Sequence, residues 1–590
     1  MPNNNAKDLT IGIVGSGGDG VIVAGDFLVW AAASEGLYCF MLKSFGAQIR
    51  GGESSCKVRM SDSPVLSQGD TLDILVAFNW GDYKKFQSEL QIRKGAVVLC
   101  EANDPTPDHE IPLDRSANPV IYKIPFQEIA TAQTGRGPGK NMVMLGVLSE
   151  MFELPVQALR NALSRKFERK GPGVAEMNLR AFDAGAIYAR DEIHRRDDIA
   201  FSYVKSDPKM VISGNEAIAL GALAARVGFF AGYPITPASE IMEYLARLMP
   251  LHDGVWIQAE DEIAAIGMAL GASFAGTRAM TATSGPGLSL MNEMVGLASL
   301  AEIPLVIVDV QRVGPSTGMP TKTEQADLQQ ALFGTHGDAP RAVIAPADVE
   351  DCFHVIMDAF CIAEEFQIPV IVLSDQFIGQ RKESVPRFDK NLIKICERLT
   401  PTPDELKDYK RYALTESGVS PMSFPGMKNG EYTAAGIEHD EFGNPAGQPE
   451  MHEAMNAKRF RKLDALKSQW KHSRRYGSPE AEIGVIGWGS SKGALKEAVL
   501  RAQAEGISVA GLVPQLLYPL PYKEFGEYLR PLRKLIVVEM SYSAQFLKYL
   551  RANYDLPTDV VLLKRSGGRP FTVSEIYETI KEEVTTSVCC

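Results

Sequence analysis

The chain has 590 residues, of which 45% are hydrophobic and 23% are charged, and its net charge is −12. These values are typical of a globular protein with about three to four domains, and they exclude a disordered or fibrous chain. The acidic balance argues against general nucleic-acid binding, which needs a basic surface. No apolar run approaches the ~18 to 20 residues that cross a bilayer, and the first residues do not resemble a signal peptide. We therefore expect a cytoplasmic protein with no membrane segment.

The eight cysteines and eight histidines are dispersed along the chain. No two cysteines form a C-x-x-C pair, and no cysteine lies at zinc-binding spacing from a histidine. We therefore expect no metal ion and no iron–sulfur cluster that this chain holds alone. We also expect reduced thiols, as is usual in the cytoplasm.

Short apolar segments alternate with amphipathic segments along most of the chain, which predicts βα units and parallel sheets. The alternation stops between residues 381 and 478, where Pro, Gly and charged residues dominate. We predict an α/β protein with three Rossmann-like domains, each built on a doubly wound parallel sheet. Their expected bounds are 1–190, 206–380 and 479–590, and residues 381–478 form a connecting segment.

The first predicted domain begins with a glycine-rich turn between a strand and a helix. Gly15, Gly17 and Gly20 in "GSGGDG" match G-x-G-x-x-G, where glycines let backbone amides approach a phosphate. Glu35 lies near the spacing of an acid that binds an NAD ribose, but it stands at an expected helix end. A phosphate-bearing ligand other than NAD is therefore favoured over NAD, and an ordinary tight turn stays open as the alternative.

The same turn contains Gly-Asp-Gly at residues 18–20, a sequence that opens the magnesium–diphosphate site of thiamine enzymes. Such a site also needs an Asn a short distance further along the chain to complete the oxygen ligands of the ion. The first Asn after this turn is Asn79, which is too far away. We therefore do not expect the turn to bind magnesium.

Three polar loops of the second predicted domain each follow an expected strand. They read "GYPITPASE" (232–240), "TATSGPG" (281–287) and "QRVGPSTGMPTKTEQADL" (311–328). Open α/β sheets bind ligands at the carboxyl ends of their strands, so the three loops together predict a binding site. Three acids, Glu260, Asp261 and Glu262, precede a helix of small apolar residues in the same domain, where acids also suit a helix N-terminus.

The connecting segment contains one strong helix signal, "EAMNAKRFRKLDALKSQWKHSRR" (453–475), which is markedly basic. Basic residues on a helix usually form a solvated face. We expect a surface helix or a subunit contact, and we rank a nucleic-acid site below both because the whole chain is acidic.

These motifs resemble those of the 2-oxoacid:ferredoxin oxidoreductases. The three loops, together with "QAEDEIAAIGMALGASFAGTRAMTATSGPG" (258–287), resemble the pyrimidine-binding domain of that family. The first domain, with "GSGGDGVIVAG" and "SFGAQIRGGESS", resembles the family's gamma domain fused ahead of the alpha domain. "AAGIEHDEFGNP" (434–445) matches the family's segment that joins the second and third domains, and residues 479–590 resemble the family's transketolase-C-like domain. The likeness is greatest to the alpha subunit of the members that act on 2-oxoglutarate.

The resemblance implies a thiamine diphosphate-dependent reaction that converts 2-oxoglutarate, coenzyme A and oxidised ferredoxin to succinyl-CoA, CO2 and reduced ferredoxin, in either direction. Glu262 would hydrogen-bond the pyrimidine ring of thiamine, while Glu260 and Asp261 are helix-start acids. The family pattern also implies roles for Thr236 and for three further groups of residues. Thr236 is a catalytic residue, Tyr233, Pro234 and Gly285 contact thiamine diphosphate, Arg312, Thr321 and Lys322 bind the 2-oxoacid, and Gly17, Gly18 and Arg50 contact coenzyme A.

The resemblance also implies partners, because the chain lacks a complete diphosphate site and a cysteine cluster. A beta subunit would bring Mg²⁺ and a [4Fe-4S] cluster, in an assembly of two alpha and two beta subunits that reduces ferredoxin. The third domain departs from the family pattern at "EMSYSAQ" (539–545), so we assign no ligand contact to Ser541. Two alternatives stay open: the same chemistry on pyruvate or an aryl pyruvate, and a non-catalytic nucleotide-binding subunit.

Overall fold

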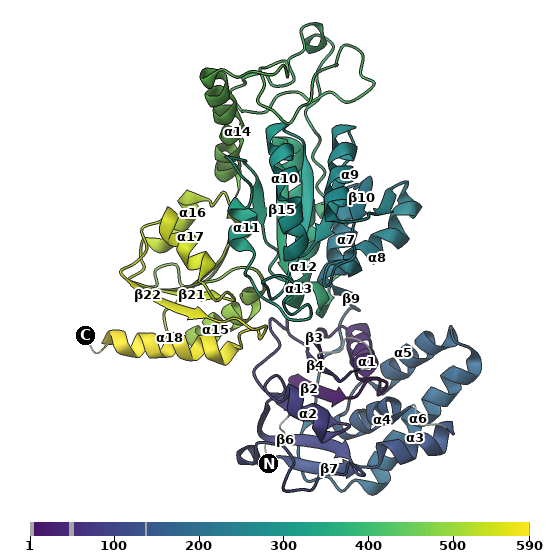
Figure 1. Ribbon diagram of the computed structural model, residues 1–590. Coiled ribbons are helices and arrows are strands. Elements are labelled where there is room, and N and C mark those ends of the chain that lie inside the picture. Colours follow the sequence, from purple (N-terminus) through teal and green to yellow (C-terminus); the bar gives the residue numbers. More distant parts are fainter. Residues whose placement is uncertain (1–4, 47–51, 136–138, 471–472, 589–590) are drawn as a thin grey trace. The chain divides into compact units, whose positions relative to one another are not determined.

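The computed structural model describes residues 5–46, 52–135, 139–470 and 473–588 (Figure 1). It divides into two compact units. Unit 1 contains Met1–Ile212, Arg381–Arg387 and Thr572–Ser574, and unit 2 contains Ser213–Gln380, Phe388–Phe571 and Glu575–Cys590. Three parallel-dominated sheets, flanked by helices, confirm the predicted α/β class. None of the helices in these described ranges has both the length and the apolar character needed to cross a membrane.

Unit 1 is built on an eight-stranded sheet in the order β7-β6-β5-β2-β4-β3-β16-β9, which ends with β16 (Lys382–Val385) and β9 (Met210–Ser213). One half is parallel, with β5 (Leu72–Ala77), β6 (Ile92–Glu101) and β7 (Val120–Ile124) beside β2 (Asp8–Gly15). The other half is antiparallel and was not predicted as such. There β3 (Tyr38–Phe45) and β4 (Ser54–Ser61) pair with each other, because the connection between them is too short for the crossover of about a dozen residues that parallel strands need.

Unit 2 contains a seven-stranded sheet in the order β11-β10-β12-β13-β15-β14-β20, which begins with β11 (Val255–Gln258). Four of its central strands are parallel neighbours, so their carboxyl ends meet at one edge. These strands are mostly buried and rich in Val, Ile and Ala, as expected for strands that are covered on both faces. They are β10 (Phe229–Gly232), β12 (Ala279–Thr283), β13 (Leu305–Gln311) and β15 (Pro369–Asp375).

The third predicted domain adds a five-stranded sheet to unit 2. Its order is β17 (Arg474–Gly477), β19 (Ala510–Val513), β18 (Ile483–Ile486), β21 (Lys534–Glu539) and β22 (Asp559–Lys564). The third domain also supplies β20 (Leu516–Tyr518), which pairs antiparallel with β14 (Ala342–Ile344) at the edge of the seven-stranded sheet. A single hydrophobic core contains side chains from both sheets, including Ile307 and Ile371 from the seven-stranded sheet and Leu535 and Val537 from the five-stranded sheet. The second and third predicted domains are therefore packed as one body.

The basic helix of the connecting segment is α14 (Pro449–Gln469), and one of its faces is buried, whereas we expected a solvated surface helix or a subunit contact. Lys458 and Lys462 are fully buried. Their ammonium groups lie 2.6 and 2.5 Å from the carboxylate of Glu302, which is also fully buried. The periodicity of the segment predicted the helix, but Glu302 lies far away in the sequence, so the charge partner could not be recognised.

One disulfide departs from the expectation of reduced thiols. It joins Cys361, near the end of α12 (Val349–Phe366), to Cys396, which is 35 residues further along the chain. The described cysteines at positions 39, 56, 100 and 352 are buried. The cysteine spacing gave no sign of the pairing, because it results from how the connecting segment returns along α12.

Candidate active site

The three predicted loops meet at the carboxyl edge of the seven-stranded sheet, beside a cavity of about 800 Å³. Arg312 and Gly285, two of the predicted site residues, line this cavity. No individual role was predicted for the other 16 lining residues, and five of them come from the third domain. The unpredicted lining includes Glu324, Asp327 and Gln330 from the second domain, and Tyr542, Ser543, Gln545, Ser566 and Gly567 from the third.

Glu262 is the first residue of α9 (Glu262–Phe274), and its side chain is buried with 6% exposure. The helix is capped by its neighbour Asp261, whose carboxylate accepts a hydrogen bond of 2.7 Å from the amide of Ala264. Within the described residues, no side chain or amide donates a hydrogen bond to the Glu262 carboxylate. The two acids therefore differ: the Asp261 carboxylate caps the helix, whereas the Glu262 carboxylate can still accept hydrogen bonds from a ligand.

The carboxylate of Glu262 lies against α10 (Gly285–Leu300), which runs beside α9. A Cβ atom on Gly287 would come within 2.8 Å of Glu262 Oε1 and within 1.9 Å of Thr283 Oγ1. A side chain at this position would therefore displace the carboxylate. The glycine in "TSGPG" is needed for this close approach, which the sequence motif did not explain.

Thr236 and Arg312 are held together although they follow different strands. Arg312 Nη1 donates a hydrogen bond of 2.5 Å to the backbone oxygen of Thr236. The guanidinium is buried, and its Nε atom has no hydrogen-bond partner in the structure. Tyr233 and Pro234, from the same loop as Thr236, are exposed. The structure thus brings Arg312 to the cavity with the Thr236 loop beside it.

Thr321 and Lys322 belong to the same long loop as Arg312, but neither lines the cavity. The Lys322 side chain packs against the backbone of Gly568, where an added Cβ would lie 2.4 Å from Lys322 Cβ. Ser541, to which we assigned no ligand contact, is fully buried and donates a hydrogen bond of 2.8 Å to Glu539. Its neighbour Tyr542 is instead 79% exposed and lines the cavity.

A group of acids beside Arg312 was missed by the sequence analysis. Asp309, on β13, is fully buried, and neither of its carboxylate oxygens has a hydrogen-bond partner in the structure. Burial, together with the charge of Asp327, raises the pKa of Asp309 well above its usual value, although Arg312 opposes this shift. The signal that could have revealed the group is an Asp inside an otherwise apolar strand, "LVIVDVQ", followed by the acids of "TEQADL".

The glycine-rich turn of unit 1 precedes α1 (Val21–Ser34), and Gly17 and Gly18 are exposed. Gly18 has a φ of 99°, a conformation that favours glycine, and an added Cβ would meet no atom within 4 Å. Asp19 partly fills the turn, since its carboxylate accepts from the Ser16 amide at 2.8 Å and lies 2.6 Å from Lys140 Nζ. Arg50 lies outside the described residues.

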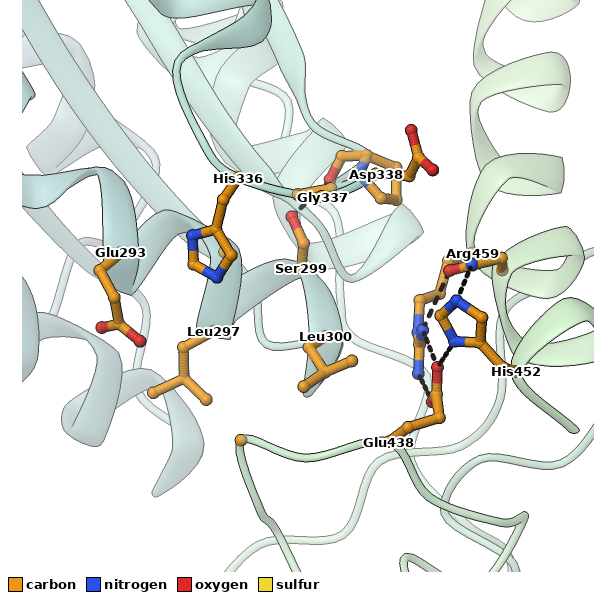
Figure 2. Close-up of a pocket in the computed structure, with 15 residues that line it drawn as sticks. Glu293, Leu297, Ser299, Leu300, His336, Gly337, Asp338, Glu438, His452 and Arg459 are labelled. Carbon is orange, nitrogen blue, oxygen red and sulfur yellow. Dashed lines mark hydrogen bonds and ion pairs between the residues drawn. The ribbon is translucent and has the colours of Figure 1, made fainter. Parts of the chain in front are cut away.

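A second cavity of about 290 Å³ lies at the other end of α10 (Figure 2). In this cavity Glu438 accepts a hydrogen bond of 2.6 Å from Arg459 Nη2 and lies 2.5 Å from His452 Nδ1. His336 and Glu293 lie on the opposite wall. None of the residues predicted from the sequence lines this cavity.

Comparison with known proteins identifies the family. Residues 220–458 match the model of pyruvate flavodoxin/ferredoxin oxidoreductase, thiamine diphosphate-binding, and residues 10–188 match that of pyruvate ferredoxin/flavodoxin oxidoreductase. Residues 481–576 match core domain II of pyruvate:ferredoxin oxidoreductase. These three ranges fall on the three predicted domains and part of the connecting segment.

Individual relatives extend over nearly the whole chain. The chain is 33% identical to the 2-oxoglutarate oxidoreductase subunit KorA of Mycobacterium tuberculosis, over 98% of this chain and 91% of that protein. It is 30% identical to the alpha subunit of a 2-oxoacid:ferredoxin oxidoreductase of Saccharolobus solfataricus, over 97% of both. A solved structure, the 2-oxoglutarate:ferredoxin oxidoreductase of Magnetococcus marinus with 2-oxoglutarate, coenzyme A and succinyl-CoA bound, is 40% identical with a TM-score of 0.93, over 98% of this chain and 100% of that one. The chain therefore belongs to the family of 2-oxoacid:ferredoxin oxidoreductases.

Proposed function

We propose that the chain is the alpha subunit of a 2-oxoglutarate:ferredoxin oxidoreductase. The reaction converts 2-oxoglutarate, coenzyme A and oxidised ferredoxin to succinyl-CoA, CO2 and reduced ferredoxin, and it can run in either direction. The observation that carries the proposal is the buried Arg312 guanidinium on the wall of the 800 Å³ cavity, held beside the Thr236 loop. The relatives that are named for 2-oxoglutarate support the choice of substrate.

Thiamine diphosphate, when bound, supplies the nucleophilic carbon and the electron sink that decarboxylation of a 2-oxoacid requires. Glu262 suits the role of the residue that hydrogen-bonds its pyrimidine ring, because the carboxylate is buried and has no described hydrogen-bond donor. Its part in the reaction is to hold and return a proton at a ring nitrogen. Tyr233, Pro234 and Gly285 provide the surface that contacts the cofactor.

Arg312 binds a carboxylate of the 2-oxoacid in this proposal. A planar guanidinium offers two parallel hydrogen bonds to a carboxylate, which an ammonium group cannot match. The unpartnered Nε of Arg312 supports this role, because a buried N–H group without a partner is costly until a ligand pairs with it. Thr236, Thr321 and Lys322 complete the proposed contacts to the substrate.

Coenzyme A is proposed to contact unit 1 through Gly17, Gly18 and Arg50. The exposed turn before α1 supports this assignment, since backbone amides at the start of a helix bind phosphates well. The negative charge of Asp19 in the same turn opposes phosphate binding, but the ion pair with Lys140 Nζ, 2.6 Å away, offsets that charge. A basic side chain such as Arg50 would then supply the missing positive charge.

A beta subunit is proposed to carry Mg²⁺, the diphosphate site and the [4Fe-4S] cluster, and to form an assembly of two alpha and two beta subunits. In the described ranges, no three His, Cys, Asp or Glu side chains gather as they would around a metal ion, which supports this division. Apolar side chains near Glu262 are open to solvent and suit a subunit contact: Ile263 is 46% exposed, Met268 41% and Leu290 50%. We place the complex in the cytoplasm, where coenzyme A and ferredoxin are available.

The proposal is tested by assaying the chain together with its beta subunit. Ferredoxin reduction is measured with coenzyme A and one of three 2-oxoacids: 2-oxoglutarate, pyruvate or an aryl pyruvate. We expect the highest kcat/KM with 2-oxoglutarate and formation of succinyl-CoA. A higher value with another 2-oxoacid would reassign the substrate, and inactivity with all three would favour the non-catalytic alternative.

A further inference from the structure

Asp327 occupies the N-cap position of α11 (Leu328–Phe333) but does not cap that helix. An Asp at this position usually accepts a hydrogen bond from an amide of the first helical turn. The Asp327 side chain instead lines the 800 Å³ cavity, and its Oδ2 atom is buried without a hydrogen-bond partner. The Asp327 side chain therefore lines the cavity and forms no capping hydrogen bond.

The position of this carboxyl group depends on a close approach to α10. A Cβ atom on Gly285 would lie only 2.7 Å from Asp327 Oδ2. On its other side, the Asp327 amide donates a hydrogen bond of 3.2 Å to Gln311 Oε1, at the end of β13. The carboxyl group is thus fixed between the first turn of α10 and the strand that precedes Arg312.

The charges around this position do not balance without an additional proton. Arg312, which is 7% exposed and has an unpartnered Nε, is the cation on the cavity wall. Three acids oppose it: Asp327 and Glu324 line the cavity, and Asp309 lies buried behind it. Glu324 accepts a hydrogen bond of 3.1 Å from the Gly567 amide. A dicarboxylate substrate would add two more negative charges, and such an arrangement strongly favours a protonated acid.

The acid most able to take up this proton at neutral pH is Asp327. Burial and the charge of Glu324 raise the pKa of Asp327 to about 7, although Arg312 opposes this shift. Asp309 is more deeply buried, and burial together with the charge of Asp327 raises its pKa well above the usual value. Asp327 therefore changes its protonation state near neutral pH.

We propose that Asp327 binds the 2-oxoacid as a neutral carboxylic acid, donating its O–H to a substrate carboxylate beside Arg312. Each substrate molecule that binds above neutral pH then brings one proton into the site. This inference rests on the proposed function, because it takes the cavity to be the 2-oxoacid site. In this proposal Asp327 and Arg312 both contact the negatively charged substrate.

The sign of the pH dependence follows from linkage. The substrate favours the protonated form of Asp327, so its Kd is constant below a pH of about 7 and rises above it, by up to about tenfold per pH unit. At pH 8, roughly nine-tenths of the free sites would be ionised, so binding should take up close to one proton per site. Asp327→Asn removes this dependence, because an amide donates a hydrogen bond at any pH.

The experiment is calorimetric titration of the assembled complex, prepared without thiamine diphosphate so that no decarboxylation occurs, with 2-oxoglutarate at pH 8 in two buffers of different ionisation enthalpy. The difference between the two heats gives the number of protons taken up, independently of turnover. We expect uptake close to one proton per site in the unchanged protein, no uptake in Asp327→Asn, and a Kd of that variant that does not vary between pH 6.5 and 8.5.

Two further variants act as controls. Glu324→Gln removes the charge that raises the pKa of Asp327, so its Kd should begin to rise at a lower pH. Glu293→Gln changes an exposed acid on the second cavity and should leave proton uptake unchanged. Binding without proton uptake, or uptake that persists in Asp327→Asn, would overturn this inference alone. The absence of 2-oxoglutarate binding at every pH would overturn the proposed function as well.

Discussion

Adjacent carboxylates at the start of α9 have different environments and therefore different expected roles. Asp261 accepts the hydrogen bond of 2.7 Å that caps the helix, whereas Glu262 is buried against Gly287 with no described donor. Glu260, the third acid of the run, is exposed. Substitutions at these three positions should therefore separate an effect on the reaction from an effect on folding.

Glu262→Gln should lower turnover by about 10² to 10⁴, the usual contribution of a positioned acid–base group. The amide keeps the size of the side chain and accepts a hydrogen bond, but it cannot share the proton of the pyrimidine ring. The measurement is the rate of exchange of the thiamine C2 proton in the assembled complex, after its cofactor content has been checked. Unchanged exchange at full cofactor occupancy would reduce Glu262 to a structural helix-start residue.

Asp261→Asn and Glu260→Gln are the matched controls for that variant. Each should leave proton exchange unchanged and should alter stability by no more than about 1 kcal/mol, the scale of a charge near a helix N-terminus. Asn also caps helices well, so Asp261→Asn tests the loss of charge more than the loss of the cap.

Arg312→Lys should preserve the positive charge and lose the planar pair of hydrogen bonds. We expect kcat/KM for 2-oxoglutarate to fall, and to fall further in Arg312→Ala, where loss of a buried charge partner costs about 2 to 5 kcal/mol. Steady-state kinetics with the assembled complex measure both variants. Arg180→Lys, on an exposed part of unit 1, controls for general effects of the replacement. Normal kinetics in Arg312→Ala would remove this residue from the substrate site.

At the scale of single residues, the sequence could predict those that lie in recognisable loop motifs. Thr236 and Arg312 follow strands in recognisable loops, and the structure joins them by a hydrogen bond. Asp309 and Asp327 were missed because their importance depends on burial and on mutual approach. Neither property can be read from residue type or spacing.

Among the elements, α14 shows how a helix of polar composition becomes part of a core. The carboxylate of Glu302 faces Lys458 and Lys462. The backbone oxygen of Glu302 accepts a hydrogen bond of 2.6 Å from Arg411. These cations hold the pKa of Glu302 well below its usual range, although burial opposes the shift. Burial lowers the pKa of Lys462 to about 7, and the charge of Glu302 counteracts that shift. Glu302 is thus the anion that attaches the connecting segment to unit 2.

Glu302→Gln should destabilise unit 2 by about 3 to 5 kcal/mol, because it leaves buried lysines without their counter-charge. The measurement is the urea concentration at the midpoint of unfolding, followed by circular dichroism. Glu453→Gln, an exposed position on α14 itself, should change the midpoint little. An unchanged midpoint in Glu302→Gln would show that the ion cluster does not hold the helix in place.

The alternation of strands and helices could be predicted because β-branched runs and helical periodicity are local signals. The antiparallel pairing of β3 with β4 and the burial of α14 could not. Both depend on contacts with residues that are distant in the sequence, and local propensity does not report such contacts. The α/β class followed from the alternation of elements alone.

For the molecule as a whole, the proposed division of the cofactor sites leads to a prediction for the isolated chain. Expressed without its beta subunit, it should neither retain thiamine diphosphate nor absorb visible light as an iron–sulfur protein does. Cofactor analysis and a visible spectrum of the purified chain check this expectation, and the same measurements on the co-expressed complex are the control. Turnover by the isolated, colourless chain would contradict the proposed assembly.

The short strand β20 has a consequence for how the chain is synthesised. It covers the edge of the seven-stranded sheet at β14, yet it lies at residues 516–518, near the end of the chain. Chains fold from the N-terminus as they emerge from the ribosome, so β14 is complete long before its neighbour exists. An open strand edge can pair with another chain in the meantime. The nascent protein therefore passes through a stage in which the seven-stranded sheet is built but its edge at β14 is uncovered, and this stage ends only when the third domain emerges.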